Sequence, residues 1–352
     1  MMEAIQETEK YIQTLLKLKT TGLITVKGFI KKREICPAAG KNFQNTLKQT
    51  GLKTIIWILQ NGKRMMNRPA LKYNGGKFRL RNWIISNFPD HRNYVETCFG
   101  AGSVLLSKKR SGLEVANDID GNVNNFFTVL RDNPKELIRM ISFTEYSEES
   151  LSHSLENIFK EEDPIKKAYY FYVISWLSLR ANDIRKSNLN FRVKGNIDGT
   201  GGHNPARLFS ETKHLKMISD RLKGVIFTQK DAIEVINEFD NKNTLFYVDL
   251  PYLFESRGRD RLYTEEFGEI EEHSKILERL TEISGMAVVS HYKHDLYDSM
   301  LSGWETVSQK TNSNSFQKGH GKKEKARIEY LYINQSATNR IQPTLFQEKM
   351  TI

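Results

Sequence analysis

Short apolar runs alternate with amphipathic segments over most of the chain. Runs rich in β-branched and aromatic residues predict strands that begin at residue 93 and cover residues 113–118, 224–228, 244–248, 286–290 and 326–334. Apolar residues at helical spacing predict helices over residues 79–88, 103–109, 122–131 and 270–284, and a further helix that ends at residue 301. Because strands and helices alternate in this way, we predict a doubly wound α/β sheet of parallel strands.

This alternation is interrupted between residues 122 and 221, where the pattern becomes helical and polar. An aromatic segment over residues 168–177 is more typical of a core helix than of a surface for stacking bases. The loop-rich stretch that follows, residues 180–207, is too long for a simple connection in a compact domain. We therefore predict an inserted module with an exposed basic loop, whose Arg, Asn and Ser side chains are types that read base edges in a groove. The candidate contacts are Arg180, Arg185, Lys186, Asn188 and Arg192.

The charge of the chain is strongly basic and unevenly placed. The net charge is +11 and the isoelectric point is about 9.3, which favours a polyanionic partner, most simply nucleic acid. Residues 1–66 contain twelve Lys or Arg against four Glu and so carry most of that charge. Their pattern predicts a helix over residues 3–19 and a helix-turn-helix over residues 43–59. This extension either adds phosphate contacts or only packs against the rest of the chain.

Several classes of protein are disfavoured by the composition. Two cysteines, Cys36 and Cys98, make neither a disulfide framework nor a zinc site, and the eight histidines show no metal-ligand spacing. The apolar run over residues 55–59 is far too short to span a bilayer. The first residues lack the apolar core of a signal peptide. We expect a metal-free protein of the reducing cytoplasm, without a membrane partner.

Two glycine-containing turns are candidate ligand sites. Gly75, Gly76 and Lys77 form a basic turn that suits a carboxylate or phosphate, although an ordinary basic turn has the same pattern and the spacing of a Walker A loop is absent. Gly100 and Gly102 follow a predicted strand, where the absence of two Cβ atoms lets a ligand approach the backbone. A dinucleotide fingerprint would need a third glycine at position 105, so this turn does not predict an NAD site.

Carboxylates follow two of the predicted strands. Asp118 stands at the end of the second strand, where a carboxylate typically binds ribose hydroxyls, or where it caps the next helix. Asp249, Leu250, Pro251 and Tyr252 follow the strand over residues 244–248. A flat base can stack on Tyr252 there, while Asp249 and the Leu250 carbonyl accept hydrogen bonds from an amino group. This tetrad therefore suits chemistry on an exocyclic amine; alone it is equally compatible with an ordinary turn.

Taken in order, these segments resemble the Dam-like class of adenine-N6 DNA methyltransferases, including its phage-borne members. The matching pieces are residues 72–77, 96–103, Asn117 with Asp118, 221–225 with Asp231, 244–252, 285–292 and 329–334. The resemblance covers about residues 68–335 and leaves out residues 1–66. It implies a Rossmann-like fold for S-adenosylmethionine-dependent methyl transfer, with a mostly helical target-recognition domain inserted into it.

The resemblance also implies an organisation and a set of roles. It divides the chain into an N-terminal extension (1–66), a discontinuous catalytic domain (67–122 and 222–335), the target-recognition insertion (123–221) and a flexible tail (336–352). The implied cofactor-binding residues are Tyr73 and Lys77 at the methionine part, Gly100 and Gly102 at the backbone approach, Asp118 at the ribose, Asp231 at the adenine, and Asp249. The implied catalytic residues are Asp249, Leu250, Pro251 and Tyr252. The substrate would be adenine flipped out of double-stranded DNA, and the product S-adenosylhomocysteine would form without a metal.

Two positions depart from the family pattern. Proline is usual where Leu250 and Cys98 stand. Leucine keeps the backbone carbonyl, and a similar tetrad with leucine occurs in ribosomal-RNA dimethyladenosine transferases. Two alternatives therefore stay open, an RNA adenine methyltransferase and a catalytically silent DNA-binding protein on the same fold.

The tail carries one more motif. Gln342, Leu345 and Phe346 resemble the short peptide that docks on bacterial sliding clamps, which makes a clamp a further candidate partner. We expect a monomer or weak dimer. The resemblance also suggests a restriction-modification setting, whereas the target sequence cannot be read from the insertion.

Overall fold

The computed structural model describes residues 68–73, 75–178, 191, 204–257, 267–311 and 327–340. The chain divides into two compact units, one of residues 1–65, 82–87 and 344–352, the other of residues 66–81 and 88–343. Within the first unit the description covers only residues 82–87. The predictions for residues 1–66, for the five candidate contacts of the insertion loop and for residues 342–346 lie outside the described residues.

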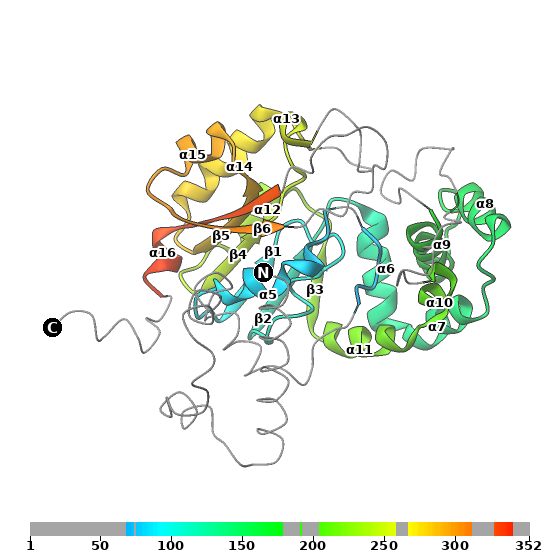
Figure 1. Cartoon of the computed structure of the whole chain (residues 1–352). Helices are drawn as coiled ribbons and strands as arrows, with labels where there is room; N and C mark the ends of the chain where they lie inside the picture. The colour runs from blue at the N-terminus through cyan, green and yellow to red at the C-terminus, as the bar shows by residue number, and fades with distance from the viewer. Residues whose placement is uncertain are drawn as a thin grey trace, which may run out of the picture. The chain divides into compact units, whose positions relative to one another are not determined.

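The second unit is built on a seven-stranded sheet with the order β3-β2-β1-β4-β5-β7-β6 (Figure 1). The parallel strands are β1 (Asn93–Glu96), β2 (Leu113–Asn117), β3 (Val225–Thr228), β4 (Thr244–Val248) and β5 (Met286–Tyr292). Strands β6 (Glu305–Thr311) and β7 (Arg327–Ile333) run antiparallel to their neighbours. In the central register Val95 pairs with Val115 on one side and with Phe246 on the other. The chain leaves β1 toward β2 and leaves β4 toward β5, so the direction of the connections reverses between β1 and β4.

The helices follow the strands in the predicted alternation. Outside the inserted segment the described helices are η1 (Lys77–Arg79), α5 (Arg81–Ser86), α12 (Ala232–Phe239), α13 (Phe254–Arg257), α14 (Ile270–Glu282), α15 (Asp295–Met300) and α16 (Gln335–Thr338). Helices α12, α14 and α15 bury Val235, Leu277 and Tyr297 in one apolar core with Phe246 and Val289 of the sheet. Every side chain of β4 is buried, as expected for a central parallel strand covered on both faces.

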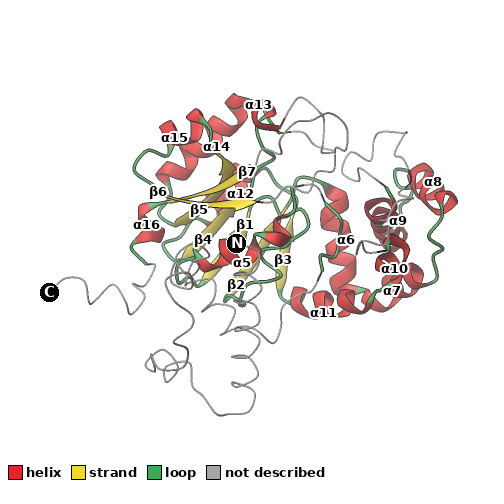
Figure 2. Ribbon diagram, in the orientation of Figure 1, coloured by secondary structure: helices red, strands yellow, loops and turns green. Residues whose placement is uncertain are grey.

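Between β2 and β3 lies the helical segment that the sequence predicts. It contains α6 (Gly121–Asp132), α7 (Pro134–Ser142), α8 (Glu148–Asn157), α9 (Pro164–Leu177), α10 (Pro205–Ser210) and α11 (Lys213–Leu222), drawn in red to the right of β3 in Figure 2. The prediction that the aromatic segment is core is confirmed, because α9 is buried along most of its length and Tyr172 stacks on Phe126 of α6. The division of the chain into a catalytic domain and an insertion stays a prediction.

Three sequence predictions need correction. The sheet is mixed rather than wholly parallel, and β6 was missed because its alternating polar residues form an edge strand with a largely exposed surface. Residues 103–109 form successive turns instead of a helix. The helix expected over residues 79–88 is divided into the 3₁₀ turn η1 and the shorter α5.

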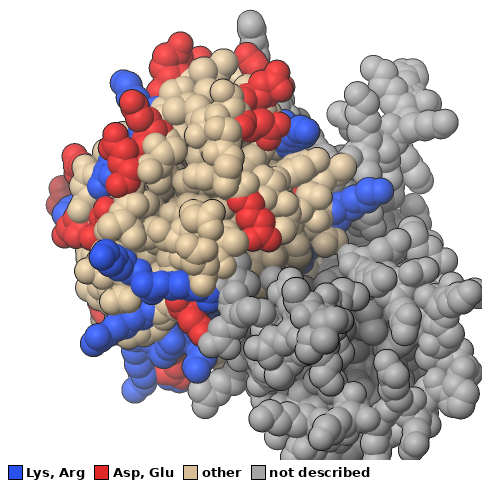
Figure 3. Space-filling view, turned by 90° about the vertical axis from the view of Figure 1, so that its left-hand side faces the viewer, with Lys and Arg blue, Asp and Glu red and all other residues tan. Residues whose placement is uncertain are grey.

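Charges are mixed on the face that Figure 3 shows. Acidic and basic side chains there surround a broad area without charged side chains, and neither sign dominates. The described residues on that face therefore form no patch of a single sign of the kind expected of a surface that binds a polyanion. Among the described residues, no helix has both the length and the apolar character needed to cross a membrane.

Candidate active site

A cavity of about 850 Å³ lies beyond the carboxyl ends of β1, β2 and β4. Its wall is completed by residues 69, 71–73 and 75–80, which precede β1 in sequence. Because the chain leaves β1 and β4 toward opposite sides of the sheet, a crevice forms at this edge, and open α/β sheets bind their ligands at such points. Ten predicted site residues line it, namely Tyr73, Lys77, Gly100, Gly102, Asp118, Asp231, Asp249, Leu250, Pro251 and Tyr252.

The glycine turn after β1 has a backbone conformation that larger residues rarely adopt. Gly100 and Gly102 have φ angles of 48° and 64°, in the left-handed region. A Cβ atom on Gly100 would meet the ring of Tyr73 at 3.2 Å, and one on Gly102 would meet the ring of Phe99 at 2.2 Å. The turn therefore presents bare backbone to the cavity, with the Tyr73 ring packed directly over it.

Asp118 ties this turn to the end of β2. Its carboxylate accepts hydrogen bonds from the amide of Gly100 at 2.7 Å and from the amide of Asp120 at 3.0 Å. Burial raises the pKa of Asp118 to about 6, against the lowering effect of those two bonds. The alternative that Asp118 caps the following helix is wrong, because the N-cap of α6 is Asp120, whose side chain accepts from the amide of Asn122.

The side chain of Asn117 joins the ends of three strands, a role that the sequence analysis missed. Its amide group donates to the carbonyls of Thr97 and Lys230, both at 2.9 Å. Its oxygen accepts from the Thr228 hydroxyl at 2.8 Å and from the Lys230 amide at 3.0 Å. A buried amide at the end of a predicted strand was the only signal for it in the sequence. Asn117 thereby fixes the floor of the cavity beneath Asp118.

The far end of the cavity is formed by Asp231 and Ile119. Asp231 is the N-cap of α12, and its carboxylate accepts from the amide of Ile233 at 2.8 Å. Its role toward the adenine of a cofactor stays a prediction. Ile119 is 52% exposed although it is a large apolar residue, and it stands directly after Asp118. This apolar surface was not singled out from the sequence, and it suits the face of a flat ring.

Asp249 is paired with Lys77 at the other end of the cavity. The Lys77 ammonium donates to the Asp249 carboxylate at 2.6 Å. Burial raises the pKa of Asp249 to about 6, because desolvation outweighs the favourable pairing. Burial alone would lower the pKa of Lys77, but the charges of Asp249 and Glu329 raise it. The pair therefore holds a cation and an acceptor oxygen in a site largely closed to water.

Leu250 and Tyr252 differ in which of their groups is available to the cavity. Leu250 is 2% exposed, and its side chain packs in the core beside Leu253. The Tyr252 ring lies 4.6 Å from Lys77 Nζ and 4.4 Å from the Tyr292 ring, measured to ring centroids. Because its side chain lies in the core, Leu250 has only its backbone to offer to the cavity, and the role predicted for its carbonyl stays a prediction. Tyr252 lines the cavity with an aromatic ring.

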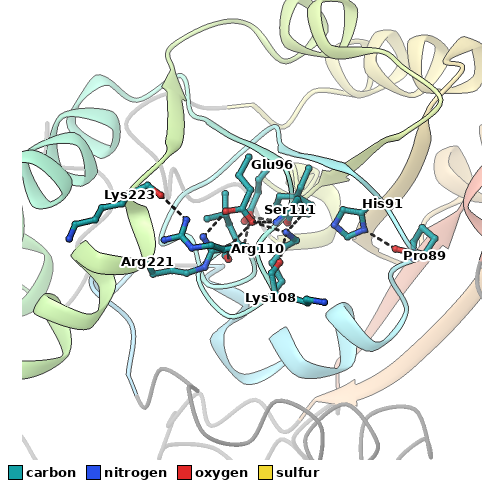
Figure 4. Close-up of polar contacts among 12 residues, drawn as sticks. Pro89, His91, Glu96, Lys108, Arg110, Ser111, Arg221 and Lys223 are labelled. Atoms are coloured by element: carbon teal, nitrogen blue, oxygen red, sulfur yellow. Dashed lines mark hydrogen bonds and ion pairs between the residues drawn. The ribbon is translucent and has the colours of Figure 1, made fainter.

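A second polar cluster lies behind the glycine turn (Figure 4). Glu96 accepts from the Tyr94 hydroxyl and the Leu105 amide, both at 3.0 Å, and burial raises the pKa of Glu96 to about 8. Arg221 at the end of α11 donates to the Leu105 carbonyl at 2.6 Å and to Glu114 of β2 at 2.6 and 2.8 Å. This cluster anchors the chain that leaves the glycine turn to both the sheet and α11.

The described part of the chain contains no group of three or more His, Cys, Asp or Glu side chains placed to hold a metal ion.

Glu329 is a cavity residue that was not predicted. Residues 329–334 belong to the segments that resemble the family, but the sequence pattern did not place Glu329 in the site. Glu329 lines the cavity from the antiparallel strand β7.

Comparison with known proteins gives one family and three relatives. Residues 73–315 match the model of a family described as D12 class N6 adenine-specific DNA methyltransferase. A DNA adenine methylase of Haemophilus influenzae is 37% identical over 71 residues, which are 20% of this chain and 24% of that protein. The type II methyltransferase M1.LlaDCHI of Lactococcus lactis subsp. cremoris is 24% identical over 199 residues, 53% of this chain and 60% of that protein. The modification methylase StsI of Streptococcus sanguinis is 25% identical over 197 residues, 53% of this chain and 29% of that protein. The matches span less than two thirds of the length of each of these relatives.

Proposed function

Because the chain belongs to the D12 class N6 adenine-specific DNA methyltransferase family, we propose that it transfers a methyl group from S-adenosylmethionine to the exocyclic amino group of adenine in double-stranded DNA. The observation that carries this proposal is that Asp249 and Tyr252 line the same cavity as the glycine turn and Asp118. The carboxylate that would accept the target amine thus lies in the same cavity as the turn and the carboxylate that would bind the nucleoside of the cofactor.

The residues of the cavity fit the cofactor. The two glycines leave room that a Cβ atom would fill, and cavities that hold ligands of this size typically measure 300–1,000 Å³. Asp118 has acceptor capacity left for ribose hydroxyls, and Ile119 offers an apolar face to the adenine ring, beside Asp231. Tyr73 and Lys77 stand where the methionine part would lie. When bound, S-adenosylmethionine supplies a methyl group on a positively charged sulfur.

Asp249 and Leu250 activate the target amine in this proposal. The lone pair of that amine is delocalised into the adenine ring and is therefore a weak nucleophile. The Asp249 carboxylate and the Leu250 carbonyl accept its two N–H groups, which favours a localised lone pair directed at the methyl group. Positioning and preorganised dipoles supply most of the effect, since the methylated ammonium is acidic enough to lose its proton without a strong base.

Tyr252 receives the base after it has left the duplex. An adenine inside the helix cannot reach a cavity of this kind, so the target nucleotide must be flipped out. The half-buried ring of Tyr252 offers a stacking surface that repays part of the cost of unstacking. The inserted segment over residues 123–221, with Arg180, Arg185, Lys186, Asn188 and Arg192, would hold the flanking duplex. The basic residues 1–66 would add phosphate contacts.

Methyl transfer from radiolabelled cofactor to unmethylated duplex DNA tests the function directly. We expect label in N6-methyladenine at a defined sequence. The absence of transfer from the wild-type protein contradicts the proposal, and the additional absence of cofactor binding by calorimetry favours a silent DNA-binding protein.

A second candidate function is methylation of adenine in RNA. Leu250 favours it, because leucine at this position is shared with ribosomal-RNA dimethyladenosine transferases. A competition between duplex DNA and RNA of the same sequence decides between the two substrates. Preferred labelling of the RNA would replace the leading proposal.

The tail adds a proposal about partners. Gln342, Leu345 and Phe346 would dock on a sliding clamp and hold a monomeric enzyme near replicating DNA. Loss of clamp binding in a Leu345→Ala, Phe346→Ala double variant supports this role, and unchanged binding removes it.

Replacing Asp118 with asparagine is expected to weaken cofactor binding. The amide would set its NH₂ group against one of the two backbone donors that Asp118 now satisfies, and it would lose the charge that binds ribose hydroxyls. A hydrogen bond to a charged group contributes about 1.5–3 kcal/mol, so we expect a dissociation constant about 10- to 100-fold higher. Calorimetric titration with the cofactor measures it, with Asp163→Asn at the N-terminus of α9 as the control. An unchanged dissociation constant would contradict the ribose role.

The rate of methyl transfer is expected to fall as the pH drops through about 6. The pKa of Asp249 is raised to about 6 by burial, so its carboxyl group gains a proton below that pH and loses the charge that accepts the amine. Above pH 6 the carboxylate is ionised and the rate should level off. Single-turnover rates at saturating cofactor between pH 5 and pH 8 measure the profile. A flat profile over this interval would show that the charge of Asp249 does not limit transfer.

A further inference from the structure

Glu329 reaches the cavity from a part of the sheet that is remote in sequence from the tetrad. In the register of β5 and β7, Glu329 pairs with Tyr292 and Leu331 pairs with Ser290. This antiparallel pairing buries the Glu329 side chain, which is 3% exposed, against the cavity beside Tyr252. A carboxylate so deeply buried needs partners to offset the loss of hydration.

The partners of Glu329 are residues of the proposed active site. Its Oε1 atom accepts a hydrogen bond from the Tyr252 hydroxyl and another from the Ser290 hydroxyl at 2.8 Å. The same atom lies 3.7 Å from Lys77 Nζ. Burial, and then the charge of Glu329, raises the pKa of Tyr252 well above its usual value. The Tyr252 hydroxyl therefore stays protonated and acts as the donor.

We propose that Glu329 is a positioning residue for the target base, which fixes the Tyr252 ring through its hydroxyl and shares the Lys77 ammonium with Asp249. This inference rests on the proposed function of the cavity. A tyrosine that only stacks on a base would be free to turn about its side-chain torsions; the bond to Glu329 holds it in one orientation. Pre-organisation of this kind lowers the entropic cost of receiving the base.

The sharing of Lys77 has a separate consequence for Asp249. One ammonium faces two carboxylates, at 2.6 Å from Asp249 and 3.7 Å from Glu329. Glu329 thus offers Lys77 a second partner when Asp249 turns to the target amine. Its negative charge also disfavours ionisation of Asp249, so its removal must lower the pKa of that carboxyl group. The titratable or charged groups that face Asp249 are Lys77, Glu96, Cys98, Tyr247, Tyr252, Tyr297 and Glu329.

The test compares Glu329→Gln and Glu329→Asp with the wild type in the full-length chain. Glutamine keeps the size but removes the charge; we expect kcat to fall about 10- to 100-fold, as for loss of a hydrogen bond to a charged group. The acid limb of the pH–rate profile should move to lower pH in this variant. Aspartate keeps the charge but withdraws the carboxylate, so kcat should fall with less movement of the limb. Cofactor affinity should be unchanged in both.

Base positioning has its own readout. Duplex DNA with 2-aminopurine at the target position should fluoresce less with Glu329→Gln than with the wild type, because the flipped base is less well held. The matched control is Tyr332→Phe on the same strand, which removes a 2.8 Å hydrogen bond to Asp298 away from the cavity. It should leave kcat, the acid limb and the fluorescence at wild-type values. Thermal unfolding of every variant establishes that it is folded.

A double-mutant cycle with Tyr252→Phe measures how strongly Glu329 and the Tyr252 hydroxyl are coupled. If Glu329 acts through the tyrosine hydroxyl, part of the loss caused by Glu329→Gln should vanish when that hydroxyl is absent. Wild-type kcat with an unmoved acid limb in Glu329→Gln would overturn the inference while leaving the proposed function intact, and so would strictly additive losses in the cycle. Failure of the wild-type protein to methylate DNA would remove the proposed function and this inference together.

Discussion

Replacement of Asp249 with asparagine is expected to lower the single-turnover rate of methyl transfer by about 10²–10³-fold, the effect of losing one preorganised polar group aimed at the reacting centre. The carboxylate is the buried acceptor at the end of β4, and it holds the Lys77 ammonium at 2.6 Å. Asparagine keeps the shape but has no charge to localise the lone pair of the amine. Its NH₂ group would also face the Lys77 donor.

The effect should separate chemistry from binding. The residues at the ribose end of the cavity are untouched by the substitution, so cofactor affinity measured by calorimetry should change far less than the rate. Asp220→Asn on the surface of α11, where Asp220 pairs with Lys223, is the matched control and should keep the wild-type rate. A rate for Asp249→Asn within a few-fold of the wild type would exclude Asp249 from the chemistry.

Much of the site could be predicted from the sequence because parallel strands bring their carboxyl ends to one edge of a sheet. Asp118 and Asp249 each follow a recognisable buried strand, and the strand order places β1 between them. The left-handed glycines are equally local signals, since their backbone angles follow from the absence of a Cβ atom. These residues converge without any knowledge of long-range pairing.

Glu329 could not be placed in the same way. Its position depends on the register of an antiparallel strand against β5, and the sequence pattern predicts only that β7 exists. A one-residue slip in that register would turn the carboxylate to the other face of the sheet. The contact with Tyr252 links positions 77 residues apart, so no local sequence pattern predicts it.

The turns over residues 103–109 show a different limit of local patterns. In a helix over these residues the Leu105 carbonyl would accept from the amide of residue 109. That carbonyl accepts instead from Arg221. Two amides, those of Leu106 and Lys108, make bonds of the helical type, whereas the amide of Ser107 bonds three residues back, to Val104. The contact with a side chain of α11 thus takes the place of a helical hydrogen bond, which periodicity cannot reveal.

The same cluster supports the largest expected effect on stability, from Glu114→Gln. Glu114 is 3% exposed and accepts two hydrogen bonds from Arg221 and one, at 2.8 Å, from Lys108. Removing one partner of a buried ion pair leaves an uncompensated charge and typically costs about 3–5 kcal/mol. Here two cations lose their carboxylate, and burial already lowers the pKa of Lys108 to about 8. We expect a loss of unfolding free energy in this range, measured by urea denaturation at pH 7.

The pH dependence of that stability has a definite sign. Burial alone would raise the pKa of Glu114, but its bonds to Arg221 and its interaction with Lys108 lower it below the ordinary value of 4.5. A carboxyl group with a lowered pKa stabilises the folded state above its ordinary pKa, and that contribution disappears as the pH falls through the folded pKa. The difference in unfolding free energy between wild type and Glu114→Gln should therefore shrink as the pH falls below about 4.5.

Two further variants separate the buried pair from charge in general. Glu136→Gln removes a carboxylate whose pair with Arg139 lies exposed on α7, and it should leave the unfolding free energy unchanged. Arg221→Met in the Glu114→Gln background removes one of the stranded cations, so part of the lost stability should return. A loss for Glu114→Gln no larger than that for Glu136→Gln would show that solvent reaches the cluster and that the pair does not anchor α11 to the sheet. A loss that Arg221→Met deepens would show that the arginine acts through the Leu105 carbonyl more than through Glu114.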